Sequence, residues 1–279
     1  MDQLQKVKEY YKETDKSYQH WGMEEIYAFH HGFWDENTKS HIESLANMNR
    51  VLAEKLKIKP GDKILDAGCG VGASAIWLAK NYDVEVTGIT ISELQCEKAK
   101  IFAKKEGLSD RVKFYVQDFQ KPEFNNTSFD IIWILESLCH GEDKGKFIRE
   151  TYRLLKKGGK LIAAEYFLTK PYPKLNAIGK WLVDRWLKSW CLPNLWTAEE
   201  FKNYAEKVGF KNIEIIDITK HTSPSSEEIF KRGFRGYLAD KYIKKRAPVQ
   251  MAHVAGCIYQ GLALKMGAWR YQIIYGKKI

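Results

Sequence analysis

Lys63-Ile-Leu-Asp66-Ala-Gly68-Cys-Gly70-Val-Gly72-Ala-Ser74 is the stretch that decides the fold of this chain. An apolar run leads into three alternating glycines and then into a helical pattern, which predicts a buried strand, a tight turn and a helix. Glycines remove side chains where the backbone bends sharply and where a ligand comes close. The first N–H groups of the following helix have no partner within it. The stretch therefore predicts a docking site for a nucleotide-like cofactor at the carboxyl end of a strand.

The spacing of these glycines excludes two common cofactor sites. A dinucleotide site needs G-x-G-x-x-G and an acid about 20 residues later, and a P-loop needs a lysine and a Ser or Thr that are missing here. The order D-x-G-x-G-x-G instead resembles the first motif of class I S-adenosylmethionine (SAM) methyltransferases. The resemblance implies that Asp66, Gly68, Cys69 and Gly70 hold SAM, with S-adenosylhomocysteine (SAH) as product. The structural alternative is an ordinary strand–helix turn without a ligand.

The next predicted strand ends in a segment that narrows the resemblance. Gly88-Ile-Thr-Ile-Ser-Glu-Leu-Gln95 lacks the ribose-binding acid of many family members. It resembles the G-I-T-x-S-x-x-Q segment of the tocopherol, sterol and cyclopropane-fatty-acid branch. The resemblance implies that Thr90, Ile91 and Gln95 contact the adenosine end of SAM. Ser92-x-x-Gln95 is also a capping box at a helix start, and both roles stay open for Gln95.

Two later strands end in further candidate residues. Asp118-Phe119 stands where the family places an acid that accepts a hydrogen bond from the adenine amino group, although a turn aspartate is the alternative. The strand at 129–135 ends in Leu135, which the resemblance adds to the cofactor site. It opens into Glu136-Ser-Leu-Cys-His140, a helix and the turn Lys156-Lys-Gly-Gly-Lys160. This order strengthens the resemblance greatly.

His140 is the first candidate for the chemistry. A histidine pKa of about 6.5 suits a general base at neutral pH, and His140 follows a strand at the carboxyl edge, where ligands bind in open α/β sheets. Glu136 is predicted to orient a polar group of the acceptor or to stabilise a developing cation. The structural alternatives are a helix-start histidine bonded to the backbone and a glutamate paired with a donor of the N-terminal segment.

The N-terminal segment 10–22 is aromatic and polar without a clean period, and it precedes Phe29-His-His-Gly-Phe-Trp34. The two segments resemble the Y…W-G…H-x-G-F/Y entry of tocopherol-type methyltransferases. The resemblance implies a cap over the cofactor in which Tyr11 or Tyr18 touches SAM. Alternatively, these aromatic side chains plug a hydrophobic edge.

Strands and helices alternate from about 63 to 167, which predicts a parallel sheet covered on both faces. The expected fold is α/β, a doubly wound, mostly parallel seven-stranded sheet. We expect a helical cap (1–58), a SAM-binding core (59–170), a helical lid insertion (171–210), and the end of the sheet with a second lid helix (211–279), in one domain. The lid carries a tryptophan-rich apolar stripe. Such a stripe is usually core, but by resemblance it forms the acceptor-site wall (Ile178, Trp181, Leu182, Trp186, Leu187 and Trp190).

Composition narrows the possible partners. The five cysteines are widely spaced without C-x-x-C, and the seven histidines lack ligand spacing, which predicts free thiols, a cytoplasmic location and no metal site. No apolar run approaches the ~20 residues needed to span a bilayer, and no signal peptide is expected. The net charge of +10 is read as solvated helix faces or as peripheral contact with an anionic membrane. Nucleic acid is not expected, because no binding module accompanies the charge.

The sequence therefore predicts a SAM-dependent methyltransferase for a lipophilic small molecule, such as a prenylated phenol or quinone, an isoprenoid or a sterol. An N-methyltransferase for a small amine and a SAM-binding protein without catalysis are the alternatives. The sequence leaves open which acceptor atom is methylated and what the oligomeric state is.

Overall fold

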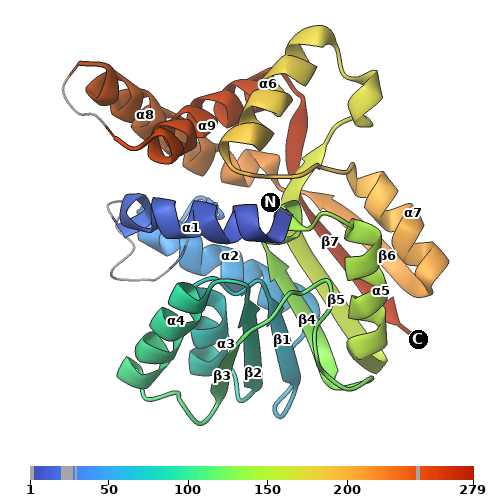
Figure 1. Cartoon of the computed structure of the whole chain (residues 1–279). Coiled ribbons are helices and arrows are strands. Elements are labelled where there is room, and N and C mark those ends of the chain that lie inside the picture. Colours follow the sequence, from blue (N-terminus) through green and yellow to red (C-terminus); the bar gives the residue numbers. More distant parts are fainter. Residues whose placement is uncertain (1–2, 20–27, 29, 243–245) are drawn as a thin grey trace.

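A computed structural model describes residues 3–19, 28, 30–242 and 246–279 of the chain. Its strands form one seven-stranded sheet in the order β3-β2-β1-β4-β5-β7-β6 (Figure 1). Only β7 runs antiparallel to its neighbours β5 and β6. The predicted mostly parallel sheet is thus confirmed. The strands are β1 (Lys63–Ala67), β2 (Glu85–Thr90), β3 (Val112–Val116), β4 (Phe129–Leu135), β5 (Leu155–Leu168), β6 (Phe210–Asp217) and β7 (Trp269–Lys278).

Helices cover both faces of the sheet, because each buried strand sends alternate side chains to opposite sides. Ile64 of β1 joins a cluster with α2, α3 and α4, whereas the adjacent Leu65 joins a cluster with α5 and α7. The helices are α1 (Gln3–Gln19), α2 (His41–Leu56), α3 (Ala73–Asn81), α4 (Glu93–Lys105), α5 (Lys144–Leu154), α6 (Ala177–Ser189), α7 (Ala198–Val208), α8 (Thr219–Tyr242) and α9 (Pro248–Lys265), with short 3₁₀ helices η1 (Leu138–His140) and η2 (Tyr172–Lys174).

We use the name lid for α6, α8 and α9 at one end of the sheet, where α9 packs against both α6 and α8, while α1 lies against α9 (Figure 1). Helix α7 of the predicted insertion instead packs beside α5 on the sheet. It begins at a capping box, in which Thr197 and Glu200 satisfy each other's backbone N–H groups. Helix α1 lies in the segment predicted as a helical cap, although its sequence has no clean helical period, and α9 was not predicted as a separate helix.

Two smaller expectations can be compared directly with the structure. The predicted turn at 156–160 is wrong in its boundary, since β5 already begins at Leu155 and the pairing register with β4 shifts between Phe129 and Ile131. The prediction of free cysteines is confirmed for all five thiols. Within the described ranges, no helix combines the length and apolar character needed to cross a membrane.

Candidate functional site

A cavity of about 450 Å³ lies between the glycine turn after β1 and the lid. Most of the predicted site residues line it, although they come from five separate segments. They are Tyr11, Asp66, Gly68, Cys69, Gly70, Thr90, Ile91, Gln95, Phe119, Leu135, Glu136 and His140. Two predicted residues are not among the lining set. Asp118 uses its Oδ1 to accept from the backbone N–H of Gln120 at 2.8 Å, and the side chain of Tyr18 lies outside the described part of the chain.

The glycine turn has the backbone that its sequence predicts. Gly68, Gly70 and Gly72 all have positive φ, at 90°, 54° and 89°, a conformation that side chains other than glycine adopt rarely. A Cβ atom on Gly68 would lie 2.3 Å from the Cβ of Ser137. The turn therefore brings bare backbone to the cavity wall.

Asp66, beside this turn, has a carboxyl oxygen without a hydrogen-bond partner in the described part of the chain. It is only 3 % exposed, and its Oδ2 has no hydrogen-bond partner among the described residues. Burial raises the pKa of Asp66 to about 7, although a hydrogen bond from the Ala75 backbone opposes this. A buried carboxylate without a partner is costly, and a cationic ligand would stabilise it. SAM carries a sulfonium and an ammonium group, so the residues present fit this cofactor.

Gln95 turns its side chain toward the cavity rather than completing the capping box. The Ser92 hydroxyl accepts from the Gln95 backbone N–H at 3.3 Å, as a cap does. The Gln95 Oε1, however, accepts from the Thr90 hydroxyl at 2.8 Å. Ser92 therefore caps α4, while Thr90 holds the amide of Gln95 at the cavity.

Tyr11 and His140 meet across 129 positions of sequence. The Tyr11 hydroxyl and His140 Nε2 are 2.7 Å apart, and this contact joins α1 to η1. Burial, with a smaller effect of the Lys144 charge, lowers the pKa of His140 to about 4. The ring is therefore neutral at pH 7, and its Nδ1 has no partner within the described ranges.

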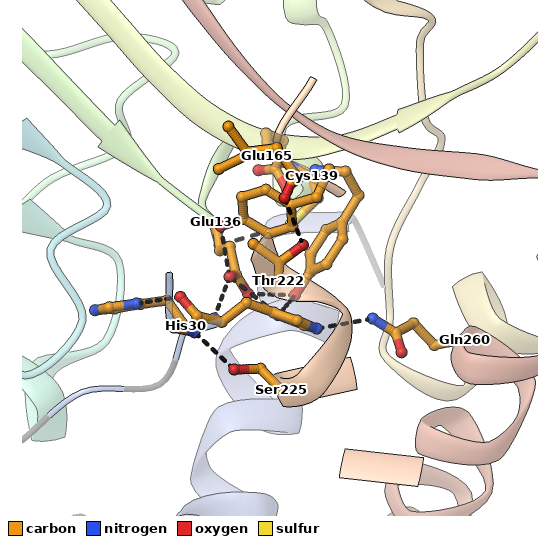
Figure 2. Close-up of polar contacts among 12 residues, drawn as sticks. His30, Glu136, Cys139, Glu165, Thr222, Ser225 and Gln260 are labelled. Atoms are coloured by element: carbon orange, nitrogen blue, oxygen red, sulfur yellow. Dashed lines mark hydrogen bonds and ion pairs between the residues drawn. The ribbon is translucent and has the colours of Figure 1, made fainter. Parts of the chain in front are cut away.

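The segment η1, which carries His140, is held from both sides. The Cys139 N–H donates to the buried Glu165 carboxyl at 2.9 Å (Figure 2). The Lys144 ammonium donates to the carbonyl oxygens of Gly141, at 2.8 Å, and Asn194, at 3.0 Å. These contacts fix the backbone on both sides of His140 and tie it to the loop that follows α6.

The carboxylate of Glu136 accepts hydrogen bonds from three residues that are distant in the sequence. Its Oε1 accepts from the His31 N–H at 2.5 Å, from His31 Nδ1 at 3.2 Å and from the Tyr271 hydroxyl at 2.7 Å, and its Oε2 accepts from the Tyr166 hydroxyl. Burial alone would raise the pKa of Glu136, but the charge and hydrogen bonds of His31 outweigh burial and lower it to about 2. The carboxylate is thus ionised and already occupied, which is the structural alternative that the sequence left open.

The lid end of the cavity is apolar with a few polar side chains. Of the tryptophan-rich stripe only Trp190 lines the cavity, whereas Trp186 is core and Trp181 is 51 % exposed. The remaining lining residues at this end include Val7, Ala28, Ile42, Leu45, Leu192 and Ile229, with His30, His31, His41, Arg232 and His253. The sequence reasoning did not assign these histidines to the site. The only signal for His30 and His31 was their place in the motif of the N-terminal entry.

Comparisons with known proteins match both the sequence and the fold of this chain. Residues 65–163 match a family model described as a methyltransferase domain. The chain is 33 % identical over 204 residues to 27-O-demethylrifamycin SV methyltransferase of Amycolatopsis mediterranei (strain S699), covering 70 % of this chain and 71 % of the relative. It is 26 % identical to the chloroplastic tocopherol O-methyltransferase of Arabidopsis thaliana, in an alignment that covers 78 % of this chain and 66 % of the relative. The crystal structure of the [4+2]-cyclase SpnF aligns with a TM-score of 0.81 and 26 % identity. The alignment covers 99 % of this chain and 96 % of the cyclase.

Proposed function

The chain belongs to the SAM-dependent methyltransferases, and on that premise we propose that it methylates a lipophilic small molecule that carries polar groups. The single observation that carries this proposal is the cavity, which runs from the glycine turn to an apolar lid end containing Trp190, Leu192 and Ile229. Apolar walls with a few polar side chains are typical of sites for such ligands. The relatives named for rifamycin and tocopherol support this class of acceptor.

The residues of the glycine turn would hold the cofactor, with Asp66 facing its cationic part and Thr90, Ile91 and Gln95 at the adenosine end. Bound there, SAM would supply a methyl group on a sulfonium, which the acceptor would receive by in-line attack while SAH leaves. The protein mainly has to align the acceptor, because the leaving group is already activated. Correct alignment can lower the barrier by ~7–11 kcal/mol.

His140 is the proposed general base for an acceptor whose nucleophile carries a proton. In the tautomer in which Nε2–H donates to the Tyr11 hydroxyl, Nδ1 keeps a lone pair. The pKa of about 4, rather than the 6.5 expected from the sequence, keeps the ring neutral at pH 7 but makes it a weaker base than a free histidine, and Tyr11 sets its orientation. Helix α1 would at the same time close over the cofactor.

We expect His140→Ala to bind SAM as the wild type does and to lose turnover by on the order of 10²–10⁴-fold, the usual contribution of general base catalysis. Calorimetry gives the SAM affinity, and single-turnover transfer from labelled SAM gives the rate. Tyr11→Phe, which keeps the ring and removes only the hydroxyl, should lose less. An unchanged rate in His140→Ala would remove this residue from the mechanism.

The acceptor is to be found by a screen with labelled SAM against prenylated phenols, isoprenoid diphosphates, sterols and small amines. Methylation confined to amines would overturn the proposed class. An amine site would use a free carboxylate, and the one carboxylate predicted for that role, Glu136, is already bonded to His31, Tyr166 and Tyr271. The arrangement therefore favours lipophilic acceptors over amines.

A second candidate is a reaction that leaves the methyl group in place. The likeness to the cyclase SpnF, at 26 % identity over nearly the whole chain, is the observation that favours it. Measuring SAH alongside product separates the two candidates. One SAH formed per product supports methyl transfer, whereas product without SAH supports the second candidate.

A further inference from the structure

His30 carries an unused hydrogen-bond acceptor at the cavity wall. The residue lines the cavity and is 9 % exposed. Its Nδ1 lies 2.9 Å from the carbonyl oxygen of His31. A carbonyl can only accept, so Nδ1 carries the proton and donates, and Nε2 is left with a lone pair. That Nε2 has no hydrogen-bond partner among the residues that the structure describes.

The backbone around His31 fixes the direction of this lone pair. The His31 N–H donates to Glu136 at 2.5 Å, and the Gly32 N–H donates to the Ser225 hydroxyl at 3.0 Å. On the far side of the segment, His31 Nε2 lies 3.2 Å from the side-chain amide nitrogen of Gln260. Figure 2 shows the His30 ring directed away from this cluster. Contacts from Glu136, which follows β4, and from α8 and α9 therefore hold the carbonyl that orients the ring.

The lone pair of His30 is permanent under ordinary conditions. Burial lowers the pKa of His30, so the ring stays neutral at neutral pH. His140 differs in this respect, because its partner is the Tyr11 hydroxyl, which can donate or accept. A buried acceptor without a donor destabilises the protein, and such a group calls for an explanation.

We propose that His30 Nε2 accepts a hydrogen bond from an O–H or N–H group of the acceptor and so anchors it in the cavity. This inference rests on the proposed function and narrows its substrate class. An apolar body with a hydroxyl, such as a prenylated hydroquinone, satisfies the lone pair. The corresponding quinone offers only acceptor oxygens and leaves Nε2 unsatisfied. A hydrocarbon olefin without a hydroxyl does the same.

The test compares binding of two small probes to the SAH-bound protein by calorimetry. Trimethylhydroquinone carries two donors, whereas its dimethyl ether has the same ring and none. We expect the hydroquinone to bind the wild type about 5- to 10-fold more tightly than the ether, the ordinary effect of one hydrogen bond. His30→Phe, which keeps a flat ring without the lone pair, should bring the two affinities together and should still bind SAH.

Side-chain ¹⁵N spectra of the histidines add a readout that a purely structural role would not move. The Nε2 resonance missing from His30→Phe should shift when the hydroquinone is added and stay in place with the ether. Equal affinities for the two probes in the wild type, no hydroquinone binding, or an unmoved Nε2 resonance would each overturn the proposal. Because these measurements need no turnover, they are independent of whether the screen finds a methylated product.

Discussion

Asp66→Ala is expected to weaken SAM binding strongly and Gly70→Val to abolish it at ordinary concentrations, while the fold survives in both. Asp66 contributes the unpartnered carboxylate oxygen beside the turn, and losing a charge-assisted contact weakens binding by on the order of 10- to 100-fold. Gly70 has a φ of 54° and lines the cavity, so a β-branched side chain there both strains the turn and fills the space for the ligand. Calorimetry with SAM measures the loss, and circular dichroism checks the fold.

Gly61→Val is the matched control for the backbone effect. Gly61 also has a positive φ, 81°, but nothing lies within 4 Å of where its Cβ would be, and it is not part of the cavity wall. This variant should be as strained as Gly70→Val and should still bind SAM. If Asp66→Ala and Gly70→Val retained wild-type affinity, the assignment of the cofactor site would be wrong.

Asp66→Asn is expected to stabilise the protein in the absence of SAM. The pKa of Asp66 rises from 3.8 to about 7 on folding, so the folded state holds the proton more tightly than the unfolded state does. Wild-type stability is therefore lost as the pH rises from about 4 to about 7. The asparagine has no such loss, and the variant should gain up to about 4 kcal/mol over the wild type at pH 8. Urea unfolding at pH 4 and pH 8 measures the difference, and the same stability gap at both values would contradict it.

Glu136→Ala is expected to be the most destabilising single change in the site. It leaves the His31 N–H, the Tyr166 hydroxyl and the Tyr271 hydroxyl without their shared acceptor. Removing one partner of a buried charged cluster typically costs about 3–5 kcal/mol, which lowers the melting temperature by roughly 10 °C in a chain of this size. Thermal melts of the variant beside Glu142→Ala, an exposed glutamate in the same connection, measure the effect.

The stabilisation that Glu136 contributes changes with pH in a definite direction. The folded pKa of Glu136 lies near 2 because His31 outweighs burial, so the stabilisation is fully present above about pH 4.5. It is lost as the pH falls toward 2. If Glu136→Ala melted at the same temperature as Glu142→Ala, the Glu136 carboxylate would not hold the segment around His31 in place. It would then be available to the acceptor.

The glycine-turn side of the cavity, which we propose holds the cofactor, could be predicted because its information is local. The strand, the three glycines and the helix start are consecutive in the sequence. The helix cap at Ser92 involves only the four residues from Ser92 to Gln95. His140 could be found in the same way, since it lies in the short 3₁₀ helix η1 soon after β4. The role of Glu136 could not be predicted, because its partners lie 30, 105 and 135 positions away. Only the sheet order brings β5, β7 and residue 31 to one carboxylate.

The acceptor half was less predictable, for a related reason. Helical spacing shows that Trp186 and Trp190 share one face of a helix, but not which of them reaches a cavity. In the structure α6 ends at Ser189, so Trp190 leaves the helix and lines the cavity, while Trp186 stays among Tyr166 and Trp269. The cavity-lining histidines His41 and His253 gave no local pattern, because they come from separate helices, α2 and α9.

Titration of the wild-type protein with SAM tests most directly whether the bend after β1 holds this methyl donor. We predict saturable binding of one SAM per chain and competition by SAH. In Gly70→Val, the heats of SAM binding and of SAH binding should both be lost. The account is contradicted if no heat appears at saturating SAM, or if a nicotinamide or flavin nucleotide occupies the site instead.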